Sequence, residues 1–265
     1  MADKSSAAPT VLITGATEGI GYELSKIYAK EAYELVLVAR NEERLKSRKR
    51  ELEDEFGVPV AIIRMDLSEP GAAKKLFELT EKHEIVVDEL INNAGYGLIG
   101  RFDKISLDDQ LNMIQLNVAE MTALCRLYLE QMVARGSGKI MNVASTASFQ
   151  PGPMMATYYA TKAFVLHLTE AIAVETKGTG VTVCALCPGP TASKFQERAG
   201  FKKPLLTQMG MMSSASVAKT GFTKMQRGKT VIITGLMNRL FAQSYRFFPR
   251  KMIQSVIRML QKNRE

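Results

Sequence analysis

Seven short apolar runs, rich in β-branched residues, recur along the first 235 residues, with helical patterns between them. Several runs are apolar at successive positions, so both faces of each predicted strand must be covered. A parallel sheet with helices on both faces meets that requirement, because a crossover helix joins successive strands. We therefore predict an α/β, doubly wound fold with a sheet of about seven parallel strands. The predicted strands are residues 10–14, 34–39, 59–64, 86–91, 139–143, 181–186 and 230–234.

Five segments between these strands have helical patterns: residues 21–30, 42–56, 71–83, 107–135 and 157–177. The fourth is the longest, and its apolar residues recur every three or four positions, which predicts one apolar stripe on one helix. That stripe could face the sheet or a second subunit. Its members are Leu111, Ile114, Val118, Met121, Leu124, Cys125, Tyr128 and Met132.

No internal repeat divides the chain, and no linker-like composition occurs before about residue 190. We predict an N-terminal tail (1–9), one α/β domain (10–235), and a basic amphipathic C-terminal appendage (236–265). After Pro249 the appendage has the pattern of a helix with two faces. The apolar face carries Ile253, Val256, Ile257 and Leu260, and the basic face carries Lys251, Arg258 and Lys262.

Positive charge is concentrated at the C-terminal end. The net charge is +8, yet residues 201–265 hold 13 Lys and Arg against the single acid Glu265. These basic residues alternate with Phe, Met, Ile and Leu, a pattern that favours a membrane or protein surface over a nucleic acid. Two interpretations of the last helix stay open: it packs on its own domain or a second subunit, or it lies on an anionic bilayer.

Other features indicate a cytoplasmic protein. The chain has three cysteines, too few for a disulfide scaffold, and residues 1–10 lack the apolar core of a secretory signal. No run approaches the ~20 apolar residues of a membrane span, so any membrane contact would be peripheral. His83 and His167 lack the spacing of metal ligands, and we predict no metal site.

A glycine-rich turn follows the first predicted strand and opens the first predicted helix. In the segment 14–21, Gly15 makes the tight turn, Gly19 lets the backbone approach a diphosphate, and Gly21 lets the helix pack closely on the strand. The helix N-terminus then points at the phosphates. This pattern predicts a dinucleotide site.

The residue after the second predicted strand meets the adenosine ribose in such sites. An acid there would bond a free 2′-hydroxyl, whereas this chain has Arg40, which favours a 2′-phosphate. Glu18, in the glycine-rich turn, has the opposite charge and opposes that preference. We predict NADP(H) as the preferred cofactor, with NAD(H) as the alternative.

Three downstream residues suit proton transfer. Tyr158 and Lys162 lie four positions apart on a predicted helix, so both can face one cleft. A phenol has a pKa of about 10, and a nearby ammonium together with a positive nicotinamide ring would lower that pKa. Ser145, at the end of the fifth strand, would hydrogen-bond a carbonyl oxygen as charge develops on it. Tyr159 is rotated by about 100° from Tyr158 and is expected to pack.

Cys184 and Cys187 form a C-x-x-C pattern within the sixth predicted strand. Their side chains would point to opposite faces of the sheet, with Cα atoms about 10 Å apart, which is beyond the reach of a disulfide. We therefore expect both to pack in the core.

These elements together resemble the classical short-chain dehydrogenase/reductase family. The resemblance rests on the motif 14–21, Asn92-Asn93-Ala94-Gly95, Asn117, Ser145, Tyr158-x-x-x-Lys162 and Pro188-Gly189, and it covers about residues 9–195. It implies a Rossmann domain, a nicotinamide cofactor, a small-molecule substrate, and a homodimer or homotetramer. The catalytic tetrad that it implies is Asn117, Ser145, Tyr158 and Lys162, with Asn117 holding a helix kink and a water in the proton relay. The implied cofactor-binding residues are Gly15, Thr17, Glu18, Gly19, Ile20, Gly21, Arg40, Asp66, Leu67, Asn93, Ala94, Gly95, Tyr158, Lys162, Pro188, Gly189 and Thr191.

In this fold the segment after the sixth strand closes over the substrate, which makes residues of about 190–217 a predicted lid. Its apolar, methionine-rich composition favours a lipophilic carbonyl over a sugar. Tyr96 could line the same cleft or be an ordinary loop aromatic. The predicted lid side chains are Phe195, Phe201, Leu205, Leu206, Met209, Met211 and Met212, and those of the opposite wall are Phe149, Met154 and Met155.

The first functional hypothesis is an oxidoreductase that transfers hydride between NADP(H) and a carbonyl or secondary alcohol, in the direction of reducing a lipophilic ketone or acyl substrate. The second is a non-catalytic scaffold at a membrane that senses NADP(H). The presence of all four tetrad residues favours the enzyme, since a scaffold has no need of a hydroxyl, a phenol and an ammonium at this spacing.

Overall fold

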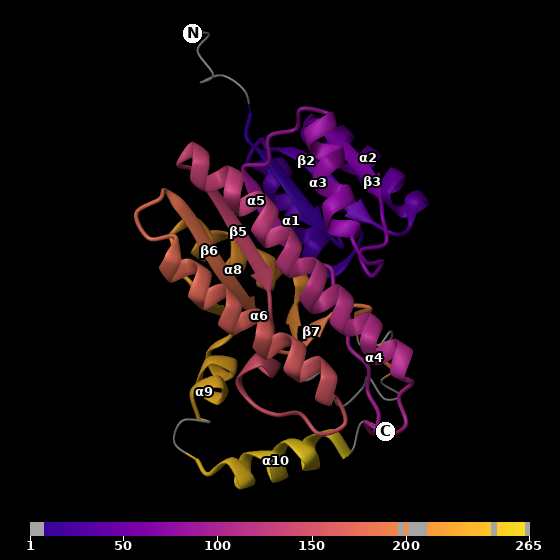
Figure 1. Ribbon diagram of the computed structural model, residues 1–265, viewed down its shortest axis with the longest axis vertical. Helices are drawn as coiled ribbons and strands as arrows, with labels where there is room; N and C mark the ends of the chain where they lie inside the picture. Colours follow the sequence, from indigo (N-terminus) through magenta and orange to yellow (C-terminus); the bar gives the residue numbers. More distant parts are fainter. Residues whose placement is uncertain (1–7, 196–198, 201–210, 245–247, 263–265) are drawn as a thin grey trace.

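The computed structural model describes residues 8–195, 199–200, 211–244 and 248–262 (Figure 1). Seven parallel strands form one sheet in the order β3-β2-β1-β4-β5-β6-β9, which confirms the predicted fold class. A short parallel pair, β7 with β8, lies outside this sheet. The strands are β1 Thr10–Thr14, β2 Glu34–Ala39, β3 Val60–Arg64, β4 Glu89–Asn92, β5 Gly138–Val143, β6 Val181–Cys187, β7 Thr191–Ala192, β8 Met212–Ser213 and β9 Val231–Ile233.

Helices cover both faces of the sheet. Alternate residues of β1 belong to different apolar clusters: Leu12 packs with α3, α5 and α6, whereas Val11 and Ile13 pack with α1, α2 and α8. The first three of these helices lie over one face in Figure 1. No helix in the described ranges is long and apolar enough to cross a membrane. The helices are α1 Gly19–Lys30, α2 Glu42–Phe56, α3 Ala72–Lys82, α4 Leu107–Ile114, α5 Met121–Arg135, α6 Ala156–Glu175, α8 Ser214–Gln226, α9 Leu236–Ser244 and α10 Arg250–Lys262.

β4 begins later than the apolar run 86–91 predicts. The backbone N–H of Asp88 donates to the carbonyl of Thr10, and the Asp88 carboxylate accepts from the N–H of Thr10. Asp88 therefore closes this end of the ladder between β1 and β4, and regular pairing starts at Glu89. Val86, before this closure, is exposed.

Residues 107–135 are helical throughout, as predicted, but a π-helical turn, Gln115–Glu120, separates α4 from α5, so the prediction of one apolar stripe is wrong. A π turn adds about one residue to the helix and rotates the preceding segment by about 100° relative to the following one. Leu111 and Ile114 are exposed as a result, and Met113 and Asn117 face the interior. Val118, in the π turn, is half-buried, and the other five members of the predicted stripe face the sheet: Met121, Leu124, Cys125, Tyr128 and Met132 are all buried in the core.

Both cysteines of the C-x-x-C pattern are free and buried, and they belong to the apolar clusters of opposite sheet faces. Burial raises the pKa of the Cys187 thiol to about 12 and also raises the pKa of Cys184. The packing interpretation agrees with this environment.

A buried carboxylate joins four elements at the amino ends of the strands. Glu89, the first residue of β4, accepts hydrogen bonds from the hydroxyls of Tyr28 (2.5 Å) and Tyr33 (2.9 Å). It also pairs with the ammonium of Lys139 on β5 (2.8 Å) and accepts from the amide of Gln226 at the end of α8 (3.1 Å). Glu89 is only 2% exposed.

Candidate functional site

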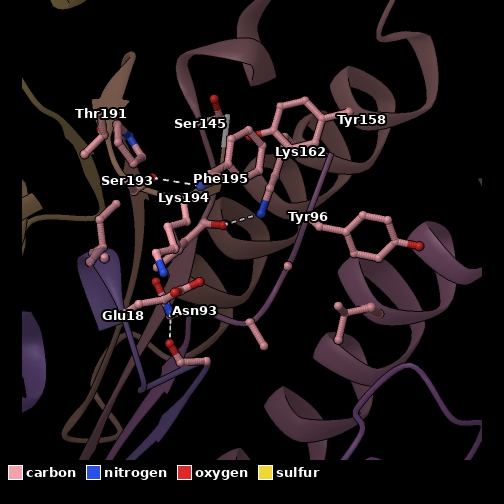
Figure 2. A pocket seen from close by; sticks show the side chains of 18 of the residues that line it. Glu18, Asn93, Tyr96, Ser145, Tyr158, Lys162, Thr191, Ser193, Lys194 and Phe195 are labelled. Atoms are coloured by element: carbon pink, nitrogen blue, oxygen red, sulfur yellow. Dashed lines mark hydrogen bonds between the residues drawn. The ribbon is translucent and has the colours of Figure 1, made fainter. Parts of the chain in front are cut away.

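A cavity of about 770 Å³ lies at the carboxyl ends of the central strands (Figure 2). Every residue of the implied catalytic tetrad and cofactor-binding set lines this cavity except Gly21 and Asn117. The fold therefore brings together residues from the turns after β1, β2, β3, β4, β5 and β6.

The glycine-rich turn is held closed by its neighbours. Gly15 has a positive φ of 65°, and its N–H donates to the carbonyl of Val38. The side-chain amide of Asn93 donates to the carbonyls of Thr14 (3.0 Å) and Gly15 (3.1 Å). A Cβ at Gly21 would lie 2.5 Å from the Gly15 carbonyl oxygen, so Gly21 permits packing behind the cavity and does not line it.

The start of α1 fits a diphosphate. Glu18, its N-cap residue, makes no side-chain cap hydrogen bond, and the first turn of the helix contains no acid. Gly19 and Ile20 line the cavity there, which leaves backbone N–H groups and the helix dipole to attract an anion.

Glu18 is neutralised by a residue that the sequence analysis did not single out. The guanidinium of Arg44 lies 2.9 Å from the Glu18 carboxylate, and both line the cavity. Arg44 lies in the first turn of α2, where its N–H donates to the side chain of Asn41. The position four residues after Arg40, at the start of a predicted helix, was the signal that could have identified Arg44.

Arg40 lies at the same end of the cavity, with its side chain 67% exposed. Its guanidinium lies 3.6 Å from the carboxylate of Asp66, which also accepts two hydrogen bonds from Ser68. Burial raises the pKa of Asp66, but these partners outweigh burial and hold that pKa below its usual value. An ionised Asp66 thus sits beside a largely solvated Arg40.

Three polar side chains face one another at the opposite end (Figure 2). Tyr158 lies in the first turn of α6, and the Lys162 ammonium, one turn later, is 6.0 Å from the centre of its ring. That ammonium donates to the carbonyl of Val143 at 2.7 Å. Ser145 follows β5 and caps the 3₁₀ turn Thr146–Phe149, its hydroxyl accepting from the N–H of Ala147.

Burial dominates the titration of this group. It raises the pKa of Tyr158 to about 12, with the Ser145 hydroxyl acting in the opposite direction. It also lowers the pKa of Lys162 to about 8. The expected lowering of the phenol pKa by the ammonium is therefore absent from this structure, because desolvation is the larger effect. Tyr158 holds its proton at neutral pH and is placed to donate it.

Asn117 lies behind the cavity, in the π turn. Its side-chain amide donates to the carbonyl of Tyr96 (2.9 Å) and the hydroxyl of Thr161 (3.1 Å), and its oxygen accepts from the N–H of Tyr96. Asn117 thereby ties the loop after β4 to the helix that carries Tyr158 and Lys162.

An apolar wall adjoins the phenol. The rings of Tyr158 and Phe195 lie 5.4 Å apart, and the wall is completed by Tyr96, Leu116, Met155 and Tyr159. Tyr96 thus lines the cavity, and Tyr159 does so as well as packing against Gly152.

The prediction of the other substrate-wall residues is partly wrong, because several of them do not line the cavity. Phe149 packs on the sheet core, and Met212 in β8 packs on the opposite face, so neither lines the cavity. Met154 and Met211 are also absent from the lining. Residues 214–217, at the end of the predicted lid, lie in α8, where Val217 is fully buried. Phe201, Leu205, Leu206 and Met209 lie outside the described residues.

A dinucleotide cradle joined to a half-buried serine and a buried tyrosine and lysine defines a class: NAD(P)-dependent oxidoreductases that act on CH–OH and C=O groups. Comparison with known proteins supplies the family. The model of the short chain dehydrogenases matches residues 9–203, and the chain belongs to that family.

Named relatives agree with this class. A short chain dehydrogenase of Pseudocercospora fijiensis is 34% identical over 190 residues, which are 70% of this chain and 60% of that protein. A 7beta-hydroxysteroid dehydrogenase of Collinsella aerofaciens is 33% identical over 180 residues, 68% of each chain. The solved structure of a short-chain dehydrogenase from Sphingobium yanoikuyae in complex with NADPH has a TM-score of 0.81 and 32% identity, covering 93% of this chain and 95% of that one.

Proposed function

We propose that this chain is an NADPH-dependent reductase of bulky, lipophilic ketones, with oxidation of the corresponding secondary alcohol as its reverse. The observation that carries the proposal is a protonated Tyr158 that faces the cavity between an apolar wall and the dinucleotide cradle. The cavity is large enough for both reactants, since its volume is about 770 Å³.

The chain's own residues perform the acid chemistry. Bound nicotinamide cofactor supplies the hydride. Tyr158 donates its proton to the substrate oxygen, and the Ser145 hydroxyl hydrogen-bonds that oxygen as negative charge develops. The Lys162 ammonium keeps a positive charge near the phenol, and Asn117 positions the helix that carries both through its bonds to Tyr96 and Thr161.

The cofactor preference rests on the cationic end of the cavity. Arg40 and Arg44 both line it, and the pairing of Glu18 with Arg44 removes the charge that would oppose a 2′-phosphate. The NADPH complex of the Sphingobium yanoikuyae relative supports this preference.

The first expected result concerns Arg40. Replacing it with Asp removes a charged partner of the 2′-phosphate and adds repulsion, so NADPH affinity should fall roughly 10–100-fold while NADH affinity rises. Titration with both cofactors measures the change. Arg50→Asp, the same charge change at an exposed site outside the cavity, is the matched control. Equal loss in both variants would show that overall charge, and not a contact with Arg40, determines the preference.

The second expected result concerns substrate size. NADPH oxidation should be at least about tenfold more efficient with a bulky bicyclic ketone than with acetone, because each additional buried methylene contributes about 0.8 kcal/mol. Phe195→Ala should reduce that ratio, whereas Phe164→Ala, at an exposed site on α6, should preserve it. A panel on which small polar ketones or sugars react best would contradict the proposed substrate class.

A further inference from the structure

An exposed apolar surface covers the two C-terminal helices, which carry none of the assigned site residues. Such side chains normally occur singly on a soluble protein, and a contiguous set marks an interaction surface. Here they recur through α9, the segment before α10, and α10 itself. We call this set the tail surface: Leu236, Met237, Leu240, Phe241, Phe248, Met252, Val256 and Met259, all exposed.

α9 shows that exposure is a property of one side of the helix. Its inner side is anchored, because Ala242 is buried and the amide of Asn238 donates to the carbonyl of Thr234 at 2.8 Å. Its outer side carries Leu236 and Phe241, which are 73% and 65% exposed. The helix is therefore docked by one face and presents an apolar face outward.

α10 carries exposed apolar residues and exposed basic residues at different positions around its axis. At 100° per residue, Met252, Val256 and Met259 fall within one narrow arc, and Lys251 and Arg258 lie beside it, roughly 100–120° away around the helix. This helix makes no extensive contact with any other element in the described ranges, and in Figure 1 it lies along the edge of the molecule. The side chains of Ile253 and Ile257, which belong to the predicted apolar face, are half-buried.

The charge of this region identifies what covers the surface. Residues 201–264 contain no Asp or Glu, and the side chains of Arg239, Lys251 and Arg258 are exposed. An amphipathic helix with cations beside a Met, Val and Ile face matches the interface of an anionic bilayer, where apolar groups enter the acyl boundary and cations reach the phosphates. A second copy of the chain would bring the same positive charge against itself.

The tail surface adjoins the catalytic end of the protein. α9 packs beside the 3₁₀ turn that follows Ser145, and a Cβ at Gly189, which lines the cavity, would collide with the side chain of Asn238. Both C-terminal helices lie at the end of the molecule toward which β5 points in Figure 1. A bilayer that binds them would therefore lie near the substrate cavity.

We propose that α9 and α10 form an interfacial anchor for an anionic membrane, which brings the cavity to a substrate dissolved in the bilayer. The statement about substrate supply rests on the proposed reductase function, whereas membrane binding does not. The chemistry of the recognised surface is an anionic phospholipid headgroup over hydrocarbon.

Sedimentation of the full chain with vesicles tests the anchor. The parent protein should bind phosphatidylcholine vesicles that contain phosphatidylglycerol, and bind weakly to phosphatidylcholine alone or at high salt. The variant Met252→Gln, Val256→Gln, Met259→Gln leaves the charge unchanged and should weaken binding at least about tenfold. The control Gln254→Ala changes the opposite face of the same helix and should bind like the parent.

Each outcome is decisive. No sedimentation of the parent with anionic vesicles at low salt, or equal loss in both variants, overturns the anchor. A dimer that dissociates in the triple variant without vesicle binding would show instead that the surface joins two copies. Unchanged melting temperature and NADPH affinity verify folding. A chain that binds vesicles but reduces no ketone would overturn the proposed function and leave the anchor standing.

Discussion

Tyr158→Phe should lower the rate of ketone reduction roughly 10²–10⁴-fold, while NADPH binding stays close to that of the parent. The change removes the one hydroxyl that holds a transferable proton beside Ser145 and keeps the ring that packs on Phe195. Because burial holds the phenol pKa at about 12, the parent enzyme enters each reduction with this proton in place. Single-turnover NADPH oxidation and fluorescence titration of the cofactor measure the two effects separately.

Tyr159→Phe is the matched control, since it removes the same atom one residue along α6 from another ring that lines the cavity. Only Tyr158 is one helical turn from Lys162, so Tyr159→Phe should be mild. Equal losses in the two variants would mean that neither phenol is the acid. A scaffold that merely senses NADPH would show no ketone-dependent oxidation in any of the three proteins.

Glu89→Leu should lower the free energy of unfolding by about 3–5 kcal/mol, the second large effect. Leucine leaves the fully buried hydroxyl of Tyr28 without its acceptor and removes the partner of Lys139. The side-chain contacts of Glu89 with α1, β5 and α8 are lost together, whereas the backbone pairing of β4 with β5 remains. Urea denaturation gives the value, and reductase activity at low temperature should change little, because this cluster lies at the amino ends of the strands.

Glu130→Leu provides the comparison, since it removes a carboxylate that pairs with Arg126 on an exposed helix face and should change stability by less than about 0.5 kcal/mol. Tyr28→Phe should lower the free energy of unfolding much less in the Glu89→Leu background than in the parent. In that background the Tyr28 hydroxyl has already lost its acceptor, so its removal costs no hydrogen bond. Additive losses would contradict the account of Glu89 as a shared acceptor.

The fold was predictable because apolar pattern and buried surface coincide. All seven apolar runs became strands of one sheet, and the alternation of Val11, Leu12 and Ile13 between two covered faces is the arrangement that such runs require. The helix break at Gln115–Glu120 was not predictable from periodicity, because a π turn shifts the phase of Leu111 and Ile114 without any proline or glycine to mark it.

The cavity was predictable to the extent that its residues stand at the ends of strands. Ser145, Tyr158 and Lys162 meet because β5 and α6 place them there, as spacing indicates. Two electrostatic features of the site depend on contacts that the sequence does not show. From the sequence, the charge of Glu18 opposes a phosphate, but in the structure Arg44 lies 2.9 Å from the Glu18 carboxylate and neutralises it. The pKa of Tyr158 follows from burial, which the spacing of Tyr158 and Lys162 does not report.

The π turn also places a limit on how stable this helix can become. Gln115–Glu120 is the site where one residue fewer would restore a continuous α-helix from Leu107 to Arg135. Such a deletion would improve local hydrogen bonding and rotate either Asn117 or the whole of α4 by about 100°. It would also alter Glu120, whose carboxylate accepts from the N–H groups of Gly71 and Ala73 at the start of α3. Regularising this helix would therefore separate Asn117 from Tyr96 and Thr161, so the irregular turn is the condition for joining the loop after β4 to α6.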